Sequence, residues 1–191
     1  MNPPPVSPRR VLALAFIAGC QGKSEPDPPR PPPAVIEARA AGATVAHIIA
    51  GHPCRAEIDH QELLIGTQPL VAQVGGSRWS GEDGEGGTML RKDGAAIVRI
   101  RDSEDAAIEV FDPQGAAILR LSADGAIANG AGEVLRRAEA THSAIKIGDA
   151  VVTGTTDIPL GVLVTAPELI SEVRALAACH RLVSREQAAR K

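Results

Sequence analysis

Short apolar runs alternate with charged positions through the middle of the chain, and their spacing of two residues is typical of strands. Turn-forming pairs such as Asp93-Gly94 and Asp124-Gly125 separate these runs. We therefore predict short antiparallel strands joined by tight turns. The predicted strands are Val45–Ala50, Arg55–Ile58, Leu63–Ile65, Leu70–Val74, Thr88–Arg91, Ala95–Arg101, Ala106–Phe111, Ala116–Leu121, Glu133–Ala138, Ser143–Ile147 and Ala150–Thr153.

One segment of this pattern occurs twice. The sequence Gly-Ala-Ala-Ile-Val-Arg-Ile at 94–100 recurs as Gly-Ala-Ala-Ile-Leu-Arg-Leu at 115–121. The offset matches the length of one hairpin unit. Two copies are too few to indicate a solenoid, but they support a repeating meander.

The alternation also assigns two faces to the predicted sheet. The apolar face comprises Val98, Ile100, Ile108, Val110, Leu119, Leu121, Ile145 and Ile147. The charged face comprises Arg99, Arg101, Glu109, Arg120 and Lys146. In simple register, Arg99, Glu109 and Arg120 would lie side by side on three neighbouring strands. Such a face is either solvated or binds an anion or a partner, so Arg99, Arg101 and Arg120 are candidate surface-binding residues.

A helix signal lies near the C-terminal end. Thr165 and Glu168 form a capping pattern around Pro167. An apolar stripe then follows at helical spacing, through Leu169, Ile170, Val173, Leu176, Ala177 and His180. We predict a helix over about 167–182 that packs on the sheet, followed by a charged tail over 184–191.

This helix is also the best candidate to cover part of the sheet, because Ile97 and Ile118 share the charged face and need shielding. The preceding run, Asp157–Val164, fits either a short helix or a strand. The predicted fold class is mainly β. An antiparallel meander over 44–183 forms a small sandwich or a barrel-like sheet, and the C-terminal helix packs on it.

Near the N-terminus the pattern changes to one apolar block. Arg9-Arg10 precede nine residues without charge and then a cysteine, an order typical of a secretory signal. A buried core helix is the alternative, but proline-rich sequence flanks the block on both sides. The last four positions, Ile17-Ala18-Gly19-Cys20, resemble the lipobox of bacterial lipoproteins.

This resemblance implies that residues 1–19 are removed and that Cys20 is lipidated. Fatty acyl chains such as palmitate, carried on its sulfur-linked glycerol and its amine, would then give stable attachment to a membrane. By the same resemblance, Gln21 in second position favours the outer membrane of a Gram-negative cell. The expected location is extracytoplasmic, with the membrane as partner through the anchor and an envelope protein as a further candidate partner.

A proline-rich segment follows the cysteine. Six prolines lie between positions 26 and 33. Proline cannot donate a backbone hydrogen bond to a sheet, so we interpret 20–43 as a semi-rigid, polyproline-like tether. The alternative is a docking site for a proline-recognition module, but such modules are mostly intracellular.

With Cys20 in the anchor, two cysteines remain, Cys54 and Cys179. An even pair in an oxidising compartment predicts a disulfide. The alternative groups them with His52 and His180 as zinc ligands or as a thiol nucleophile. The spacings match no known zinc-finger pattern, and no motif orients a nucleophile, so we expect neither a metal nor a cofactor.

Composition excludes some functions. Removal of residues 1–19 leaves 18 basic and 23 acidic residues, a balance that argues against nucleic acid. The chain has no tyrosine, and only Trp79 and Phe111 remain as aromatic residues after the signal, so stacking on sugars or bases is disfavoured. The acidic run 79–87 lacks the spacing of a calcium loop and is interpreted as a mobile hairpin tip.

Two functional hypotheses remain. The first is a lipid-anchored envelope protein whose β domain is non-catalytic and serves binding or assembly. The second is an extracytoplasmic metal- or thiol-dependent hydrolase that uses Cys54, Cys179 and the neighbouring histidines. No hydrolase, zinc-protease or phosphate-loop motif is present, so the first hypothesis is favoured.

Overall fold

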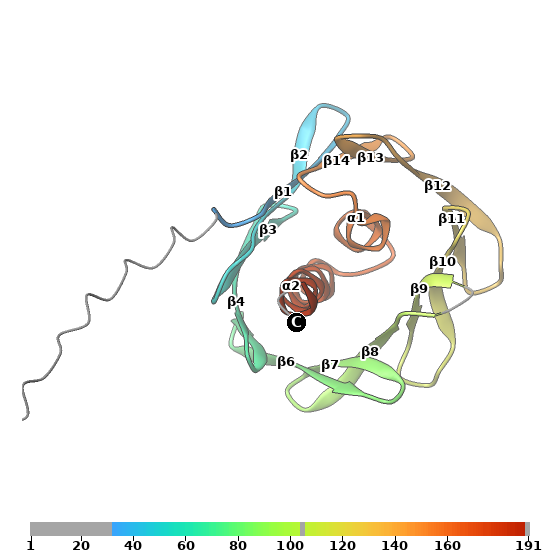
Figure 1. Ribbon diagram of the computed structural model, residues 1–191. Coiled ribbons are helices and arrows are strands. Elements are labelled where there is room, and N and C mark those ends of the chain that lie inside the picture. Colours follow the sequence, from blue (N-terminus) through green and yellow to red (C-terminus); the bar gives the residue numbers. More distant parts are fainter. Residues whose placement is uncertain (1–31, 104–105, 190–191) are drawn as a thin grey trace, which may run out of the picture. The chain divides into compact units, whose positions relative to one another are not determined.

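The computed structural model describes residues 32–103 and 106–189, in which fourteen antiparallel strands form a closed barrel (Figure 1). Strands adjacent in sequence are neighbours, and β1 pairs with β14 to close the ring. The predicted mainly β meander is therefore confirmed, in its barrel form. The strands are β1 (Val35–Ala40), β2 (Ala43–Ile49), β3 (Cys54–Ile58), β4 (Gln61–Thr67), β5 (Leu70–Val74), β6 (Ser77–Gly84), β7 (Gly87–Lys92), β8 (Ala95–Arg101), β9 (Ala106–Phe111), β10 (Ala117–Ser122), β11 (Ala126–Asn129), β12 (Val134–Ala140), β13 (Ala144–Ile147) and β14 (Ala150–Thr153).

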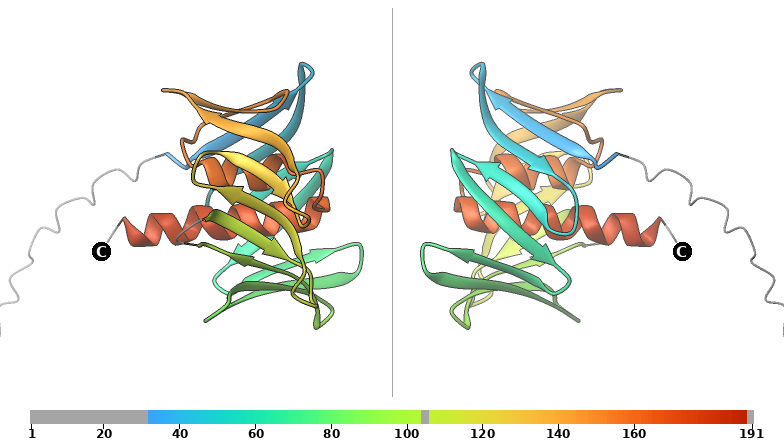
Figure 2. Two further views of the ribbon diagram at one scale, coloured as in Figure 1. Left: turned by 90° about the vertical axis from the view of Figure 1, so that its right-hand side faces the viewer. Right: turned by 90° about the vertical axis from the view of Figure 1, so that its left-hand side faces the viewer.

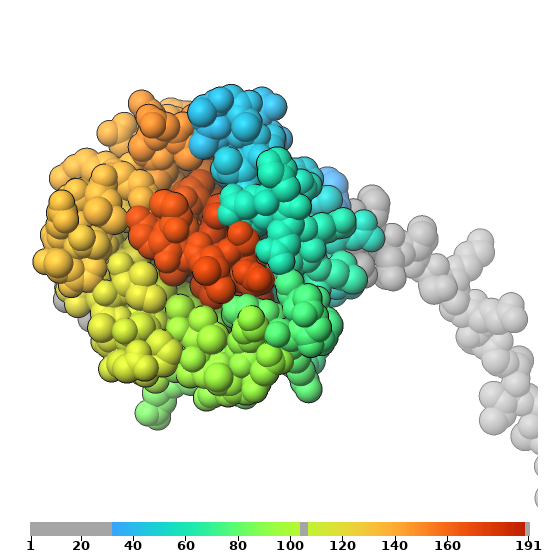
Figure 3. All heavy atoms as spheres, turned by 180° about the vertical axis from the view of Figure 1, so that it is seen from behind, coloured from blue at the N-terminus to red at the C-terminus, as the bar shows by residue number. Residues whose placement is uncertain are grey.

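Two helices follow the strands and lie inside the ring: α1 (Ile158–Thr165) and α2 (Ser171–Ala188) (Figures 1 and 2). Seen from behind, their atoms fill the centre of the barrel (Figure 3). The inward side chains of the strands thus pack on helices rather than on a second sheet. A helix in this position needs apolar residues all round, and α1 is buried from Leu160 to Val164.

Helix α2 packs against one wall of the barrel, which is formed by β3, β4 and β5 (Figure 1). The buried side chains of this wall include the small residues Ala56 and Ala72 as well as the larger Ile58 and Ile65, and α2 contributes Ala175 and Ala178 to the core. The strands on the opposite side bury larger side chains: Ile108, Val110, Leu119, Leu121 and Ile127.

The two ends of the barrel differ in the elements that meet there. We call the end at which β1 begins and α2 ends the mouth (Figure 2). At the other end, α2 begins beside the β3–β4 turn. There the buried Arg174 donates to Asp59 over 2.6 Å and to the carbonyl of Val164 over 3.1 Å. Burial lowers the pKa of Arg174 and Asp59 raises it, with a net value below the usual one.

Three strands lie where the sequence did not predict them. Strand β1 falls within the predicted tether 20–43, so the barrel begins at Val35 and not at 44. Its alternating residues Ile36 and Ala38 enter the core, which a spacer would not do. Strand β6 occupies most of the run predicted as an acidic loop, with Trp79 buried and only residues 85–86 left as the tip. Strand β11, which follows the Asp124-Gly125 turn, was not predicted.

The predicted start of the C-terminal helix is wrong. Thr165 ends α1 and donates to the carbonyl of Gly161, while α2 begins at Ser171. The capping pattern failed because both oxygens of Glu168 accept from Arg136 on β12, over 2.8 and 2.6 Å. At the other end, α2 continues through the predicted charged tail as far as Ala188. The undecided run 157–164 is helix α1.

Ile97 and Ile118, which were predicted to need a cover, each lie at a β-bulge. The register skips Ile97 between β7 and β8, and it skips Ile118 between β9 and β10. A bulge breaks the strict alternation of faces, and both isoleucines pack against the core. The two bulges occupy equivalent positions in the repeated segments 94–100 and 115–121, so the repeat is structural as well as sequential.

The signal segment, Cys20 and the prolines up to Pro31 lie outside the described residues, so the predictions made for them remain predictions. No helix in the part of the chain that the structure describes is long and apolar enough to span a bilayer.

Candidate functional site

A cavity of about 420 Å³ opens at the mouth of the barrel. It lies between the C-terminal half of α2 and the wall formed by β6 to β9. The cavity has this position because α2 packs against β3–β5 and leaves space on the opposite side of the barrel. The side chains and glycines around it are Asp83, Gly84, Gly87, Thr88, Ile100, Asp102, Ile108, Leu163, Ala177, His180, Arg181, Ser184, Arg185 and Ala188.

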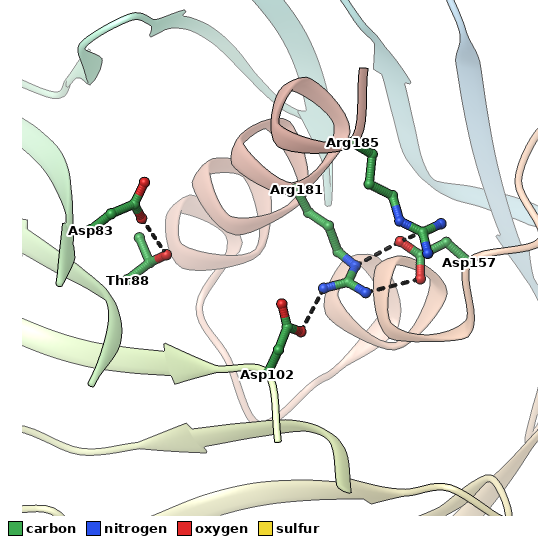
Figure 4. A network of polar contacts seen from close by, with 6 residues as sticks. All are labelled: Asp83, Thr88, Asp102, Asp157, Arg181 and Arg185. Atoms are coloured by element: carbon green, nitrogen blue, oxygen red, sulfur yellow. Dashed lines mark hydrogen bonds and ion pairs between the residues drawn. The ribbon is translucent and has the colours of Figure 1, made fainter. Parts of the chain in front are cut away.

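A network of charges forms the rim of this cavity (Figure 4). Arg181 on α2 donates to both oxygens of Asp157, over 2.6 and 3.2 Å, and to Asp102 over 2.7 Å. Arg185 lies one turn further along α2, 3.2 Å from Asp157. Burial lowers the pKa of Arg181, but the two carboxylates raise it by more, so the net value is above the usual one. Arg181 therefore fixes α2 to the segment before α1 and to the end of β8.

Asp83 forms a second polar cluster on the same rim. Thr88 donates to its Oδ1 over 2.7 Å, and Nε2 of His180 lies 3.1 Å from its Oδ2. Partial burial raises the pKa of Asp83, but the hydrogen bond from Thr88 and the proximity of His180 lower it, and the net pKa is below the usual value. The carboxylate is thus ionised at neutral pH.

The mouth has polar groups but lacks the contact that starts nucleophilic catalysis. Ser184 lies one helical turn from His180, yet no hydrogen bond joins its hydroxyl to the imidazole among the contacts of residues 32–103 and 106–189. Activation of a serine requires that contact. The same described residues include no group of three or more His, Cys, Asp or Glu side chains placed to hold a metal ion.

The predicted surface-binding residues lie on the outside of the barrel, and their register differs from the simple one. Glu109 faces Arg101 on β8 and Arg120 on β10, whereas Arg99 faces Phe111. Glu109 is only 8% exposed and pairs with both neighbours: Arg101 donates to its Oε2, and Nε of Arg120 lies 3.3 Å from its Oε1. The predicted row of Arg99, Glu109 and Arg120 is therefore wrong for Arg99, because Arg101 occupies that position.

We call Arg99, Arg101 and Arg120 the arginine face. A groove of about 390 Å³ is lined by two of these side chains, Arg99 and Arg101, and lies between the tip residue Gly86 and the turn 112–115, which contributes Asp112. Arg101 lies over the ring of Phe111, with its guanidinium carbon 5.1 Å from the ring centre. Arg99 makes no ion pair with any residue in the described part of the chain. The face thus carries three guanidinium groups around one carboxylate.

The predicted disulfide is present. Cys54 at the start of β3 is bonded to Cys179 in α2, and both are fully buried. It joins the wall of the barrel to the central helix. The neighbouring histidines contact other groups: Nδ1 of His52 lies 2.5 Å from the hydroxyl of Thr67, and Nε2 of His180 lies near the carboxylate of Asp83.

The charged network at the mouth was missed in the sequence. Its acidic members come from three separate parts of the chain, namely strand β6, the segment after β8 and the segment before α1, and no spacing relates Asp83, Asp102 and Asp157. One signal was available: Arg174, Arg181 and Arg185 recur at helical spacing on α2, which indicates a polar strip on a largely apolar helix.

Comparison of the chain with protein-family models, with curated proteins and with solved structures finds no significant match. Function therefore has to be inferred from the geometry of the barrel and from the N-terminal sequence.

Proposed function

We propose that this chain is a lipid-anchored envelope protein whose barrel is a non-catalytic binding domain. We further propose that the arginine face recognises an anionic partner, such as an acidic segment of another envelope protein. The lipobox resemblance at Cys20 supports the anchor. The arginine face, on a rigid and closed sheet, supports the binding role.

One observation carries the binding proposal: guanidinium groups outnumber carboxylates on the arginine face. Glu109 is enclosed by Arg101 and Arg120, so it neutralises one charge and holds both side chains in place. The nearby carboxylate of Asp112 accepts backbone N–H groups of its own turn, at Gln114 and Ala116. Arg99 remains available, and its guanidinium is suited to bidentate contact with a carboxylate.

The binding role predicts a specific loss. The double variant Arg99→Gln/Arg120→Gln should bind a decaglutamate peptide about five- to tenfold more weakly in low salt, because each exposed charge pair contributes roughly 0.2–1 kcal/mol. Calorimetric titration measures this. The matched control is Arg39→Gln/Arg55→Gln, which removes the same net charge from β1 and β3. An equal loss in both double variants would mean that net charge alone, and not this face, attracts the peptide.

The anchor predicts a change of location. Replacement of Cys20 by Ala removes the only acceptor for lipid in the lipobox, so the protein should move from the membrane to the soluble fraction. Fractionation of cells that express the unmodified and Cys20→Ala chains, with detection of the barrel by antibody, measures the shift. Retention of the variant in the membrane would contradict the anchor.

The thiol-dependent form of the hydrolase hypothesis does not fit the disulfide. A thiol-dependent mechanism needs a free thiolate, and both Cys54 and Cys179 are consumed by the disulfide. No observation at the mouth or on the arginine face favours a hydrolase, so it is not proposed as a second function.

A further inference from the structure

The mouth cavity is a separate site, on the inside of the barrel and distinct from the arginine face. Its volume of about 420 Å³ is within the range of small-molecule pockets. Its floor is apolar and comes from four elements: Ile100 of β8, Ile108 of β9, Leu163 of α1 and Ala177 of α2. An aliphatic chain placed on this floor would leave water at little cost.

The rim carries the carboxylates of Asp83, Asp102 and Asp157 and the guanidinium groups of Arg181 and Arg185. Asp157, whose side chain is 2% exposed, is committed to Arg181 and Arg185. Asp83 and Asp102 are different, because their side chains are 69% and 72% exposed. Asp102 accepts from Arg181 through Oδ1, and its Oδ2 has no hydrogen-bond partner among the described residues. Three carboxylates thus face the two guanidinium groups of Arg181 and Arg185, and His180 lies beside Asp83.

We propose that the mouth cavity binds an aliphatic amine. Its methylene chain lies on the apolar floor and its ammonium group donates to the rim carboxylates of Asp83 or Asp102. An ammonium has three donors and no acceptor, which matches two exposed carboxylates, of which Asp102 has an oxygen without a partner among the described residues. An aliphatic carboxylate would gain the same apolar contact but would meet two exposed negative charges. An alcohol would gain the apolar contact and only neutral hydrogen bonds.

The test compares three probes that share one chain length. The full chain is titrated at pH 7 with n-hexylamine, hexan-1-ol and hexanoate, and binding is followed by the methyl NMR signals of Ile100, Ile108 and Leu163. We expect hexylamine to bind about tenfold more tightly than hexanol, the difference that one charge-assisted contact supplies, and hexanoate to bind most weakly. Equal affinities for hexylamine and hexanol, tighter binding of hexanoate, or no binding of any probe would overturn the proposal.

A variant pair identifies the groups that recognise the amine. Asp83→Asn/Asp102→Asn should lower the affinity for hexylamine about tenfold and leave that for hexanol unchanged. Binding of hexanol reports that the cavity is still formed, so a folding defect is distinguished from loss of recognition. The control is Glu62→Gln on the exposed side of β4, which should bind hexylamine as the unmodified chain does. Unchanged hexylamine affinity in the double variant would exclude these carboxylates as the recognition groups.

Discussion

Replacing both Cys54 and Cys179 with serine should lower the free energy of unfolding by about 4 kcal/mol. The bond closes a loop with a sequence separation of 125 residues, and the unfolded chain without it gains the corresponding conformational freedom. For a domain of this size, that loss lowers the midpoint of thermal unfolding by roughly 8–16 °C. Urea titration followed by circular dichroism measures the free energy, and a thermal scan measures the midpoint.

The control for this experiment is the Cys20→Ser chain, which keeps the pair and should unfold as the unmodified sequence does. Unfolded without reductant, it should show no free thiol, since Cys54 and Cys179 are its remaining cysteines. Two titratable thiols, or a thermal midpoint that reductant does not lower, would contradict a stabilising disulfide.

The second large effect is expected at Asp157. Replacement by alanine should cost about 3 kcal/mol of unfolding free energy, because it removes the buried partner of Arg181 and leaves a largely desolvated guanidinium. Asp102→Asn is the matched control. Asp102 contacts the same guanidinium, but its side chain is 72% exposed, so its replacement should cost less than about 1 kcal/mol.

Urea unfolding of the two variants, measured side by side, gives the comparison. Similar costs at both positions would mean that burial does not decide the strength of these ion pairs. A negligible cost at Asp157 would mean that water or Asp102 replaces it, and that the mouth network contributes little to stability.

The sequence predicted the faces of the sheet well, because alternation depends on local geometry alone. Val98, Ile108, Val110 and Leu119 all point inward as expected. It could not predict that the register shifts at Ile97 and Ile118, since a bulge changes which residues face each other without changing the composition of either strand. The pairing of Arg101, and not Arg99, with Glu109 comes from the register of β8 with β9, which places Arg99 opposite Phe111.

The position of α2 inside the barrel could not be predicted from the local sequence pattern. An apolar stripe predicts a helix on a sheet, and α2 does contact β3, β4 and β5. That it lies within a ring depends on the pairing of Glu37 with Thr153, two positions more than a hundred residues apart. The disulfide was predictable from the count of cysteines. The mouth cavity was not predictable, because it depends on the position of α2 against β3, β4 and β5.

The order of the elements along the chain has a consequence for synthesis. All fourteen strands of the described barrel precede α1 and α2, so the ring is translated before the helices that fill it. Until α2 emerges, residues such as Ile108 and Leu121 have no helix to pack against. The apolar inner faces of the strands therefore stay uncovered by the helices until the final segment has been made, and only then can Cys54 meet Cys179.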